Sequence, residues 1–354
     1  MLKKIFTLFI CITISVCAFA WYDTARWMNE LPDSTYICSM TLPGTHDTFT
    51  YNLGITASWG QTQTLDVCEQ FESGVRVFDL RPVYTKWTDY DEEGNVYNHE
   101  INEIYHGKFS TDINTDEAFK SLENLVSTYS SEFIIAIISI ECDSDSNTYP
   151  STQAFIKQKE EGMKGNDLYV QEYRADLTLG EVRGKILIIN RDDLPHSEGE
   201  ELYGFFTNGF TGAYTESYLT LNGRASSGGT PVMKYYVQDK DHYVRDYDFL
   251  TEKFAYFEKV ADNYYADPDY YCLCINNTSG WCGESVVTMD YNENADVMNY
   301  YVSHTYIPNT PRYHVPGKWR GLGIVLMDFA GEKSYGSHFV YGYDLVCTLI
   351  DLNF

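Results

Sequence analysis

Basic residues are scarce in this chain of 354 residues, where 25 lysines and arginines stand against 51 aspartates and glutamates. The formal net charge is −26. Binding to nucleic acid needs clustered positive charge along the phosphate backbone, so the composition argues against that partner. It also argues against long-range attraction to an anionic membrane. Any membrane contact must therefore be local and apolar, and the 16% aromatic content leaves room for one.

Long apolar runs are absent beyond the N-terminus. Residues 1–20 join two lysines, an apolar stretch and a final Ala-Phe-Ala triplet, which are the three parts of a secretory signal. The stretch is too short for a membrane-spanning helix. We predict a signal peptide over residues 1–20 and a secreted, extracellular mature chain, with an uncleaved anchor as the alternative. The mature chain would hold 23 basic and 51 acidic residues, a net charge of −28.

Metal-binding cysteine spacings are also missing. The sequence has nine cysteines but no C-x-x-C pair, and the nearest histidines do not complete a zinc spacing. Seven cysteines remain after the signal peptide; export favours disulfides, and an odd number leaves at least one thiol unpaired. The C-x-C of Cys272 and Cys274 predicts a buried strand with both thiols on one face.

No linker, charge block or tandem repeat divides residues 21–354, so we predict a single domain there. Short apolar runs recur along it, and several, such as FIIAIISIE and KILIIN, lack polar alternation. Such runs are typical of parallel strands buried on both faces. The predicted strands are Tyr36–Thr41, Val75–Leu80, Glu103–His106, Phe133–Glu141, Lys185–Asn190, Val232–Gln238, Tyr271–Ile275 and Gly323–Phe329.

Helical spacing of apolar residues separates several of these runs, at Leu65–Phe71, Asp116–Tyr129 and Leu250–Val260. Strands that alternate with helices predict an α/β fold, and eight of them predict a distorted (β/α)8 TIM barrel. The interval 190–231 is rich in glycine and polar residues and reads as a loop. An open doubly wound sheet is the alternative, weakened because no G-x-G-x-x-G follows the first strand.

Charged side chains cluster after the predicted strands, where the active sites of such barrels lie. The stretch TLPGTHDTF places His46 and Asp47 directly after what reads as a Pro-Gly turn. The other residues at strand ends are Asp79, Arg81, His106, Glu141, Arg191, Asp239 and Asp328. We therefore expect these groups to meet at the mouth of the barrel.

Two histidines and an arginine suit the cleavage of a phosphodiester by an internal hydroxyl. One imidazole can remove a proton while the other donates one, because both titrate near neutral pH. A neighbouring carboxylate, such as Asp47 or Asp328, orients a ring and stabilises its protonated form. An arginine fork matches the phosphoryl oxygens, on which negative charge gathers during the reaction.

The ordered motifs resemble the X domain of the secreted, bacterial-type phosphatidylinositol-specific phospholipases C. The matching segments are WMNELPDS, TLPGTHDTF, ESGVRVFDLRP, EIYHGKF, SEFIIAIISIE, GKILIINR, YYVQDK and GIVLMDF. They run in the family's order over residues 27–330. The resemblance implies a distorted TIM barrel that cleaves phosphatidylinositol to diacylglycerol and inositol 1,2-cyclic phosphate.

The resemblance also implies a role for each site residue. His46 would be the general base and His106 the general acid, with Asp328 orienting His46 and Asp47 supporting His106. Arg81, with Asp79 beside it, would stabilise the phosphate. The inositol hydroxyls would be bound by Arg191 and Asp239.

The sequence departs from the family in two places. A lysine that is usual in the fourth strand is Ser139 here, and the tyrosine that stacks on inositol is Asp241, with Tyr243 near enough to substitute. A retained Arg81 implies a mechanism with no cofactor, whereas calcium-dependent relatives replace it with metal ligands. We expect a monomer that acts on phosphatidylinositol, or on the same phosphodiester in a glycan-linked (GPI) anchor, at a membrane surface.

Three alternatives stay open at this point. The first is a barrel that binds inositol phospholipids but has little turnover, for which Ser139 is the only support. The second is a calcium-dependent phosphodiesterase on the same fold, with Asp47, Asp79 and Glu141 as ligands. The third is an enzyme for glycerophosphodiesters, which would need a carboxylate metal site that is not obvious beside His46.

Overall fold

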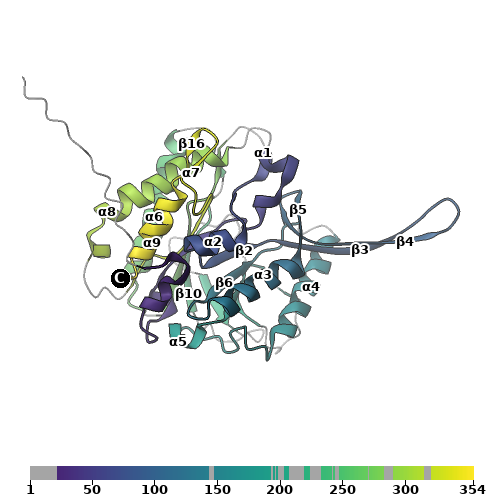
Figure 1. Cartoon of the computed structure of the whole chain (residues 1–354), viewed down its shortest axis with the longest axis horizontal. Coiled ribbons are helices and arrows are strands. Elements are labelled where there is room, and N and C mark those ends of the chain that lie inside the picture. Colours follow the sequence, from purple (N-terminus) through teal and green to yellow (C-terminus); the bar gives the residue numbers. More distant parts are fainter. Residues whose placement is uncertain are drawn as a thin grey trace, which may run out of the picture.

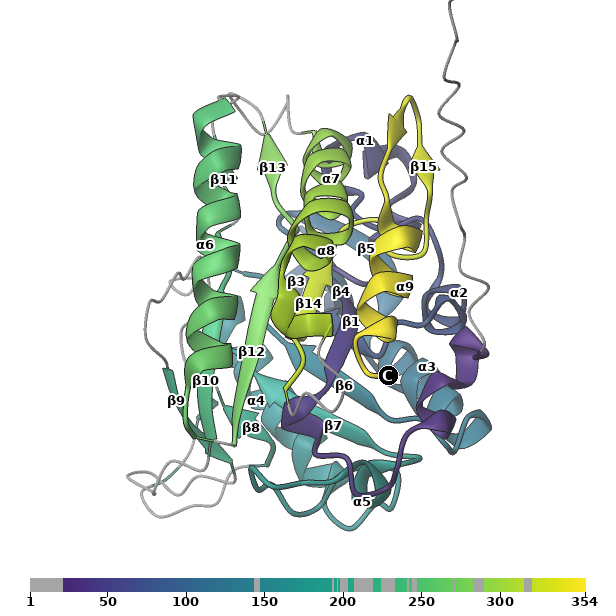
Figure 2. The same ribbon diagram turned by 90° about the vertical axis from the view of Figure 1, so that its left-hand side faces the viewer.

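The computed structural model describes residues 22–142, 147–192, 194–195, 197, 203–206, 219–223, 233–240, 242–243, 247–269, 271–282, 290–314 and 320–354. The predicted signal peptide lies outside these ranges. Within them a closed barrel forms the centre of the molecule, and helices pack around it (Figures 1 and 2). The prediction of a distorted α/β barrel is confirmed.

The barrel contains nine described strands, in the spatial order β1-β14-β12-β10-β9-β8-β7-β6-β2. All neighbours are parallel except β9, which runs antiparallel to β8 and β10. The strands are β1 (Thr41–Thr45), β2 (Val77–Leu80), β6 (Ile134–Ile138), β7 (Ile186–Asn190), β8 (Phe205–Phe206), β9 (Leu219–Gly223), β10 (Met233–Gln238), β12 (Cys272–Asn277) and β14 (Gly323–Met327). The interval 190–231, which we predicted to be a loop, therefore contributes β8 and β9.

Two predicted barrel strands are wrong. The run Glu103–His106 belongs to a separate sheet, and the first strand begins at Thr41, near the end of the run predicted for it. Pro43 and Gly44 lie inside β1 and do not form a turn. Gly44 is needed there because an added Cβ would come within 2.6 Å of a Leu326 methyl group. Parallel neighbours on both sides thus hold this segment extended, against the local turn preference of Pro-Gly.

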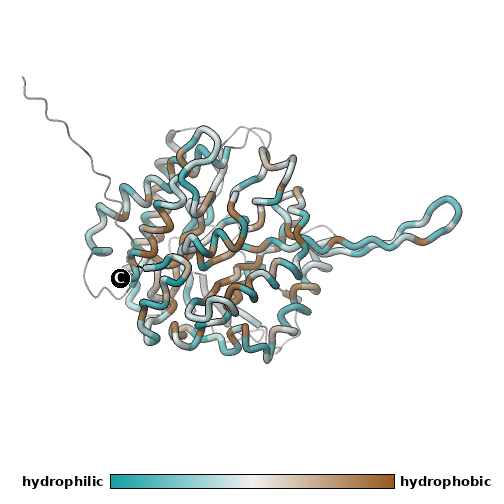
Figure 3. The backbone as a smooth tube through the Cα atoms, in the orientation of Figure 1, coloured by the Kyte–Doolittle hydropathy of each residue, from teal (hydrophilic) through white to brown (hydrophobic). Residues whose placement is uncertain are grey.

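The separate sheet is a long arm that projects from the barrel (Figure 1). It consists of β3 (Pro82–Tyr90), β4 (Val96–His106) and β5 (Phe109–Asn114), all antiparallel. The outer part of the arm is mostly hydrophilic, whereas the barrel strands are hydrophobic (Figure 3). The arm begins one residue after Arg81 and its second strand ends at His106, so the hairpin returns the chain to the barrel mouth.

The remaining described elements are helices and two short strand pairs. The α-helices are α1 (Ala57–Gly60), α2 (Val67–Ser73), α3 (Thr115–Thr128), α4 (Thr148–Met163), α5 (Leu179–Val182), α6 (Tyr247–Ala266), α7 (Tyr291–Tyr300), α8 (Ile307–Asn309) and α9 (Gly342–Asp351). Shorter 3₁₀ turns are η1 (Thr24–Glu30), η2 (Ile37–Ser39), η3 (Thr50–Asn52), η4 (Gly54–Thr56) and η6 (Pro311–His314), and η5 (Tyr301–Tyr306) is a π-helix. The strand pairs are β11 (His242–Tyr243) with β13 (Trp281–Cys282), and β15 (Ser334–Tyr335) with β16 (His338–Phe339).

Helix α3 illustrates how the sequence sets the outer layer. Asn114 caps its start by accepting a hydrogen bond from the Asp116 N–H at 2.9 Å. Its apolar residues Phe119, Leu122 and Val126 recur every three or four positions and are buried. A stripe with this spacing lies on one face of a helix, which packs against the sheet while the other face meets water.

Other parts of the predictions also hold in the described structure. Helices α2, α3 and α6 overlap the three predicted helical segments. Cys272 and Cys274 lie on β12, and both are buried in one cluster with Tyr236, Val260 and Tyr264. Within the described ranges, no helix is both long and apolar enough to cross a membrane.

Candidate active site

The mouth of the barrel collects the charged residues that follow the strands. His46 and Asp47 follow β1, Asp79 lies in β2 with Arg81 just beyond it, and Asp328 follows β14. The carboxyl ends of parallel strands meet at one edge, so residues distant in sequence come together. His106 reaches the same place from the end of β4.

His46 lies between two carboxylates. Its Nδ1 is 2.9 Å from Asp328 Oδ1, and its Nε2 is 3.2 Å from Asp47 Oδ2. Burial alone would lower the pKa of His46, but the charges of Asp47 and Asp328 outweigh it and raise the pKa to about 9. The two carboxylates therefore favour the protonated ring.

Asp47 joins the two histidines. Its Oδ2 is also 3.2 Å from His106 Nε2, and its Oδ1 is 2.6 Å from Arg81 Nε. The residue has a φ of +46°, in the left-handed region that aspartate tolerates better than most residues. Its N–H donates to Asp79 Oδ2 at 3.2 Å. The hydrogen bond to Asp79 stabilises this left-handed conformation, in which the Asp47 carboxylate points into the mouth of the barrel.

Arg81 is surrounded by three carboxylates. Besides Asp47, its Nη2 donates to Asp79 Oδ2 at 3.0 Å and its Nη1 to Glu141 Oε2 at 3.0 Å. Burial would lower the pKa of Arg81, but Asp47, Asp79 and Glu141 together raise it well above its usual value. In turn Arg81 holds the pKa values of Asp79 and Glu141 below their usual ranges, against the effect of burial. The guanidinium thus stays charged and fixed.

His106 is held from both ring nitrogens. Its Nδ1 lies 2.6 Å from the Gly60 carbonyl oxygen, which can only accept, so Nδ1 carries a proton. Its Nε2 then points to Asp47, and the His46 and His106 ring centroids are 6.4 Å apart. The ring of Tyr291 stands edge-on to His106 at 5.8 Å. The Nε2 atoms of both histidines therefore face the same oxygen, Asp47 Oδ2, at 3.2 Å.

The residues predicted to bind inositol lie close to this cluster. Arg191 Nη2 forms an ion pair with Asp239 Oδ2 at 2.7 Å, and both residues are buried. The charge of Arg191 also helps to lower the pKa of Asp79, which places the pair beside the Arg81 cluster. Ser139, at the position of the family's lysine, is buried just after β6. The prediction for Tyr243 falls on a side chain outside the described part of the structure.

Three groups could together hold a metal ion. One ligand atom each from His46, Asp47 and Asp79 lie within 4.8 Å of one another. Asp79 Oδ1 and both carboxylate oxygens of Asp47 are buried and have no hydrogen-bond partner in the described structure, although the Asp47 oxygens lie at ion-pair distances from Arg81 and the histidines. The two carboxylates suit a hard cation such as Ca²⁺, which prefers oxygen ligands, but the imidazole of His46 does not. In addition, Arg81 already forms ion pairs with Asp47 Oδ1 and Asp79 Oδ2.

Sequence reasoning missed the residues that hold the histidines in place. Gln63 is fully buried, and its Nε2 donates to the carbonyls of His46 at 2.8 Å and Met327 at 2.9 Å. Its Oε1 accepts from the Ala330 N–H at 3.1 Å. One amide thus ties the segment with His46 to the segment with Asp328. A single glutamine in a polar stretch belongs to no motif or periodic pattern, so the sequence does not predict this role.

Gly60 and Tyr291 were missed for a similar reason. An added Cβ on Gly60 would lie 3.0 Å from His106 Nδ1, so the glycine allows the close approach of the ring to its carbonyl. Tyr291 is one of 31 tyrosines in the sequence, and nothing in its local context distinguishes it.

Comparison with known families identifies the larger part of this site. A family model described as "Phosphatidylinositol-specific phospholipase C, X domain" matches residues 40–192. This segment of the chain is thus similar to the X domain of that family. The family resemblance predicted from the motifs is therefore confirmed. The matched segment includes His46, Arg81 and His106, whereas Asp239 and Asp328 lie beyond it.

Similar proteins extend the comparison along the chain. The 1-phosphatidylinositol phosphodiesterase of Staphylococcus aureus is 25% identical over 367 residues, which cover 100% of each chain. The enzyme of the same name from Listeria monocytogenes is 25% identical over 320 residues, covering 88% of this chain and 83% of the relative.

Solved structures share the fold of this chain. The phosphatidylinositol-specific phospholipase C of Listeria monocytogenes superimposes with a TM-score of 0.60 at 21% identity, over 94% of this chain and 99% of the other. A Staphylococcus aureus phospholipase C with pentafluoro-Phe incorporated gives a TM-score of 0.65 at 21% identity, over 92% and 97%. These likenesses show the fold.

Proposed function

We propose that the chain is a secreted phosphatidylinositol-specific phospholipase C that works without a metal ion. It cleaves phosphatidylinositol into diacylglycerol and inositol 1,2-cyclic phosphate. The observation that carries the proposal is the grouping around Asp47: the Nε2 atoms of His46 and His106 both lie 3.2 Å from Oδ2, and Arg81 Nε lies 2.6 Å from Oδ1. The full-length relatives named 1-phosphatidylinositol phosphodiesterase support the same reaction.

In this mechanism the two histidines move one proton each. His46 Nε2 takes the proton from the inositol 2-hydroxyl, whose oxygen attacks the phosphorus. His106 Nε2 gives its proton to the glyceryl oxygen as the bond from that oxygen to phosphorus breaks. Arg81 presents a charged fork to the phosphoryl oxygens, where negative charge gathers in the transition state. The products are the cyclic phosphodiester and neutral diacylglycerol.

The high pKa of His46 conflicts with its role as a base, and substrate binding would lower that pKa. A base must lose its proton to act, and in the ligand-free site Asp47 and Asp328 favour the protonated ring. The 2-hydroxyl would take the place of Asp47 at His46 Nε2, so that Asp47 stays with His106 and Arg81. His46 then faces one carboxylate, its pKa falls, and it can accept the proton while Asp328 keeps the ring oriented.

Arg191 and Asp239 form the ring-binding side of the proposed site. The pair is buried, so a sugar hydroxyl placed between them would accept from the guanidinium and donate to the carboxylate. Ser139 stands where the family has a lysine. Among the described residues that we assign to the site, the cations are then Arg81 and Arg191. Specificity for inositol therefore rests on the hydroxyl pattern more than on charge.

The lipid has to be met at a membrane surface, and we propose that a monomer meets it there through exposed aromatic residues. Trp59 on α1 is 46% exposed and directly precedes Gly60, whose carbonyl holds His106. An aromatic side chain beside the mouth can insert locally in spite of the acidic net charge. We place the protein outside the cell because of the predicted signal peptide.

Phosphorus NMR of the purified mature protein with phosphatidylinositol in mixed micelles, in EDTA, tests the reaction. The wild-type protein is expected to form a cyclic phosphodiester, and the His46→Ala variant none. His99→Ala is the matched control, because His99 stacks on Trp87 on the arm and should not affect turnover. A His46→Ala variant that keeps wild-type activity would contradict the assigned base.

Calcium dependence is the second candidate, favoured by the grouping of His46, Asp47 and Asp79. In the same experiment it predicts no product in EDTA and recovery with calcium. Arg81 competes for two of the same carboxylates, which is why we prefer the metal-free mechanism. If neither condition yields product, the protein binds the lipid without cleaving it, or takes another substrate.

A further inference from the structure

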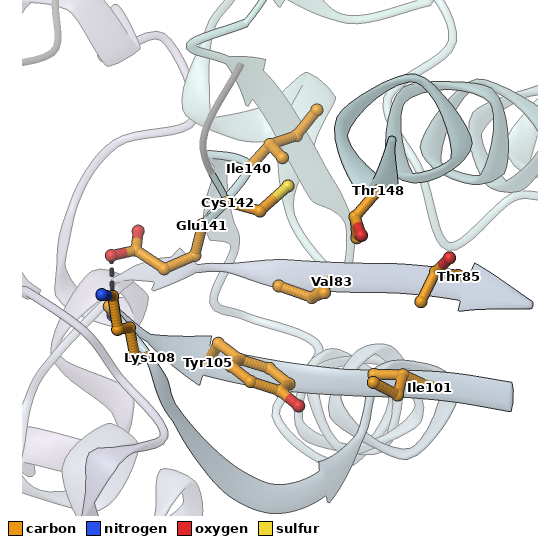
Figure 4. A pocket seen from close by; sticks show the side chains of 10 residues that line it. Val83, Thr85, Ile101, Tyr105, Lys108, Ile140, Glu141, Cys142 and Thr148 are labelled. Carbon is orange, nitrogen blue, oxygen red and sulfur yellow. Dashed lines mark hydrogen bonds between the residues drawn. The ribbon is translucent and has the colours of Figure 1, made fainter. Parts of the chain in front are cut away.

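A cavity of about 520 Å³ opens next to the candidate active site, at the base of the arm (Figure 4). Side chains from β3 and β4 line one side, and residues from the segment that follows β6 and from the start of α4 line the other. Val83, Ile101 and Ile140 provide apolar walls, together with the ring of Tyr105. Its volume lies in the range typical of sites for small organic ligands.

The cavity touches the site through Glu141. Glu141 lines the cavity, and its two oxygens accept from Arg81 Nη1 at 3.0 Å and from the Gly107 N–H at 2.8 Å. Tyr105 and Gly107, the two neighbours of His106 in sequence, also line it. The apolar space therefore starts within one residue of the proposed general acid.

Strand β4 is irregular between Glu103 and Tyr105. Its register against β5 shifts there, just before His106, as it does at a β-bulge. A bulge re-aims the side chains that follow it, and such bulges are common beside active sites. Here it accompanies the placing of Tyr105 in the cavity while His106 faces Asp47.

We propose that this cavity, the acyl groove, holds the first part of one acyl chain of the leaving diacylglycerol. The inference rests on the proposed function. His106 would protonate the glyceryl oxygen, so the glycerol and its chains depart on the His106 side, where the groove begins. Apolar walls suit a hydrocarbon chain. Lys108, exposed at the edge, can donate to an ester carbonyl.

The groove predicts that short-chain substrates are cleaved faster as the chain lengthens, even when no membrane is present. Each methylene that is moved from water to an apolar wall favours the bound state several-fold. For monomeric substrates, kcat/KM should rise about fifteenfold from dibutanoyl- to dihexanoyl-phosphatidylinositol, because the one chain in the groove gains two methylenes. Glycerophosphoinositol, which has no acyl chain, should be the slowest of the three.

Variants of Ile101 test whether the groove causes this dependence. Ile101→Asn makes a wall polar and Ile101→Phe fills the space, so both should reduce the dihexanoyl-to-dibutanoyl ratio to below about twofold. Val96→Asn is the matched control, because Val96 lies on the same strand, is 56% exposed and does not line the cavity. It should keep the wild-type ratio. Circular dichroism confirms that each variant is folded.

The outcomes separate this inference from the proposed function. A wild-type protein that cleaves glycerophosphoinositol but has a flat ratio refutes the groove and leaves the phospholipase activity standing. An unchanged ratio in both folded Ile101 variants refutes it as well. If the wild-type protein cleaves none of the three substrates in EDTA or with calcium, the proposed function fails and the acyl groove fails with it.

Discussion

His46 Nδ1 and Asp328 Oδ1 lie 2.9 Å apart in the buried floor of the mouth, although 282 positions separate them in the sequence. The Gln63 Nε2 group donates to the carbonyls of both His46 and Met327, so it holds the two segments that carry His46 and Asp328 together. The pair holds the proposed base in one orientation and favours its protonated form.

Asp328→Asn should therefore lower both the rate and the basicity of His46. The amide keeps the shape but not the charge, and it can favour the wrong tautomer, so kcat should fall by about 10²- to 10⁴-fold. The pKa of His46 should fall from about 9 toward its ordinary value, as read by NMR titration of the imidazole. Asp296→Asn, beside His338 at 3.6 Å, is the control that should change neither.

Stability should depend on pH through the same histidine. The folded-state pKa of His46 is raised to about 9, above the unfolded value near 6.5. Its stabilising effect is therefore fully present below pH 6.5 and is lost as the pH rises through 9. The free energy of unfolding should drop by up to about 3 kcal/mol over that window.

Chemical denaturation of the wild type and of His46→Asn between pH 6 and 9.5 measures this effect. The variant lacks the titrating ring, so its profile should be flatter than that of the wild type. Two parallel profiles would show that the charges of Asp47 and Asp328 do not raise the pKa of His46 in the folded protein.

Replacing Arg81 by lysine should reduce turnover although the positive charge remains. A lysine cannot contact Asp47, Asp79 and Glu141 at once or offer a two-pronged fork to phosphate. We expect kcat/KM to fall by about 10²- to 10³-fold. Arg174→Lys is the matched control, because that half-buried arginine also pairs with three carboxylates, those of Glu172, Asp176 and Glu181. Equal activity of the two variants would remove Arg81 from the reaction.

Gln63→Leu tests whether Gln63 positions the catalytic residues or only contributes to the stability of the fold. It removes three hydrogen bonds and leaves the buried Ala330 N–H unsatisfied, at a cost of about 1–3 kcal/mol. The Met327 carbonyl still accepts from the His46 N–H, and the His46 carbonyl from the Thr62 hydroxyl. Gln171→Leu is the control, because the Gln171 amide also binds the backbone at both ends: Nε2 donates to three carbonyls, and Oε1 accepts from the Gly165 N–H. Gln171 is not one of the residues assigned to the site. Both variants should melt earlier, and only Gln63→Leu should also lose kcat in the folded state. Equal kcat values would confine Gln63 to stability.

Salt should speed the reaction on anionic vesicles. A chain with a formal charge of −26 is repelled by a surface of phosphatidylinositol, and the range of the repulsion shortens from about 30 Å at 0.01 M salt to about 10 Å at 0.1 M. Initial rates on phosphatidylinositol vesicles should rise over that interval, and more than the rates on monomeric glycerophosphoinositol. A steep fall with salt would point to a basic membrane-binding surface.

Much of the fold could be predicted because its signals are local. Uninterrupted apolar runs such as FIIAIISIE mark strands that are covered on both sides, and the helical stripe of α3 marks the outer layer. The additional strands β8 and β9 could not be predicted, because their segments are short and their pairing depends on neighbours that are distant in sequence. Pro43 and Gly44 misled for the same reason: their turn preference is overridden by partners on both sides of β1.

The sequence by itself determined which chemical groups stand at the ends of the strands, since His46-Asp47 and Asp79 with Arg81 are fixed by adjacency and spacing. Only the tertiary structure decided that Arg81 meets carboxylates from three segments and that His106 arrives through an arm outside the barrel. It also decided the high pKa of His46 and the apolar cavity at the base of the arm. Those properties depend on distance and burial between residues far apart in the chain, which closure of the barrel sets and local sequence does not encode.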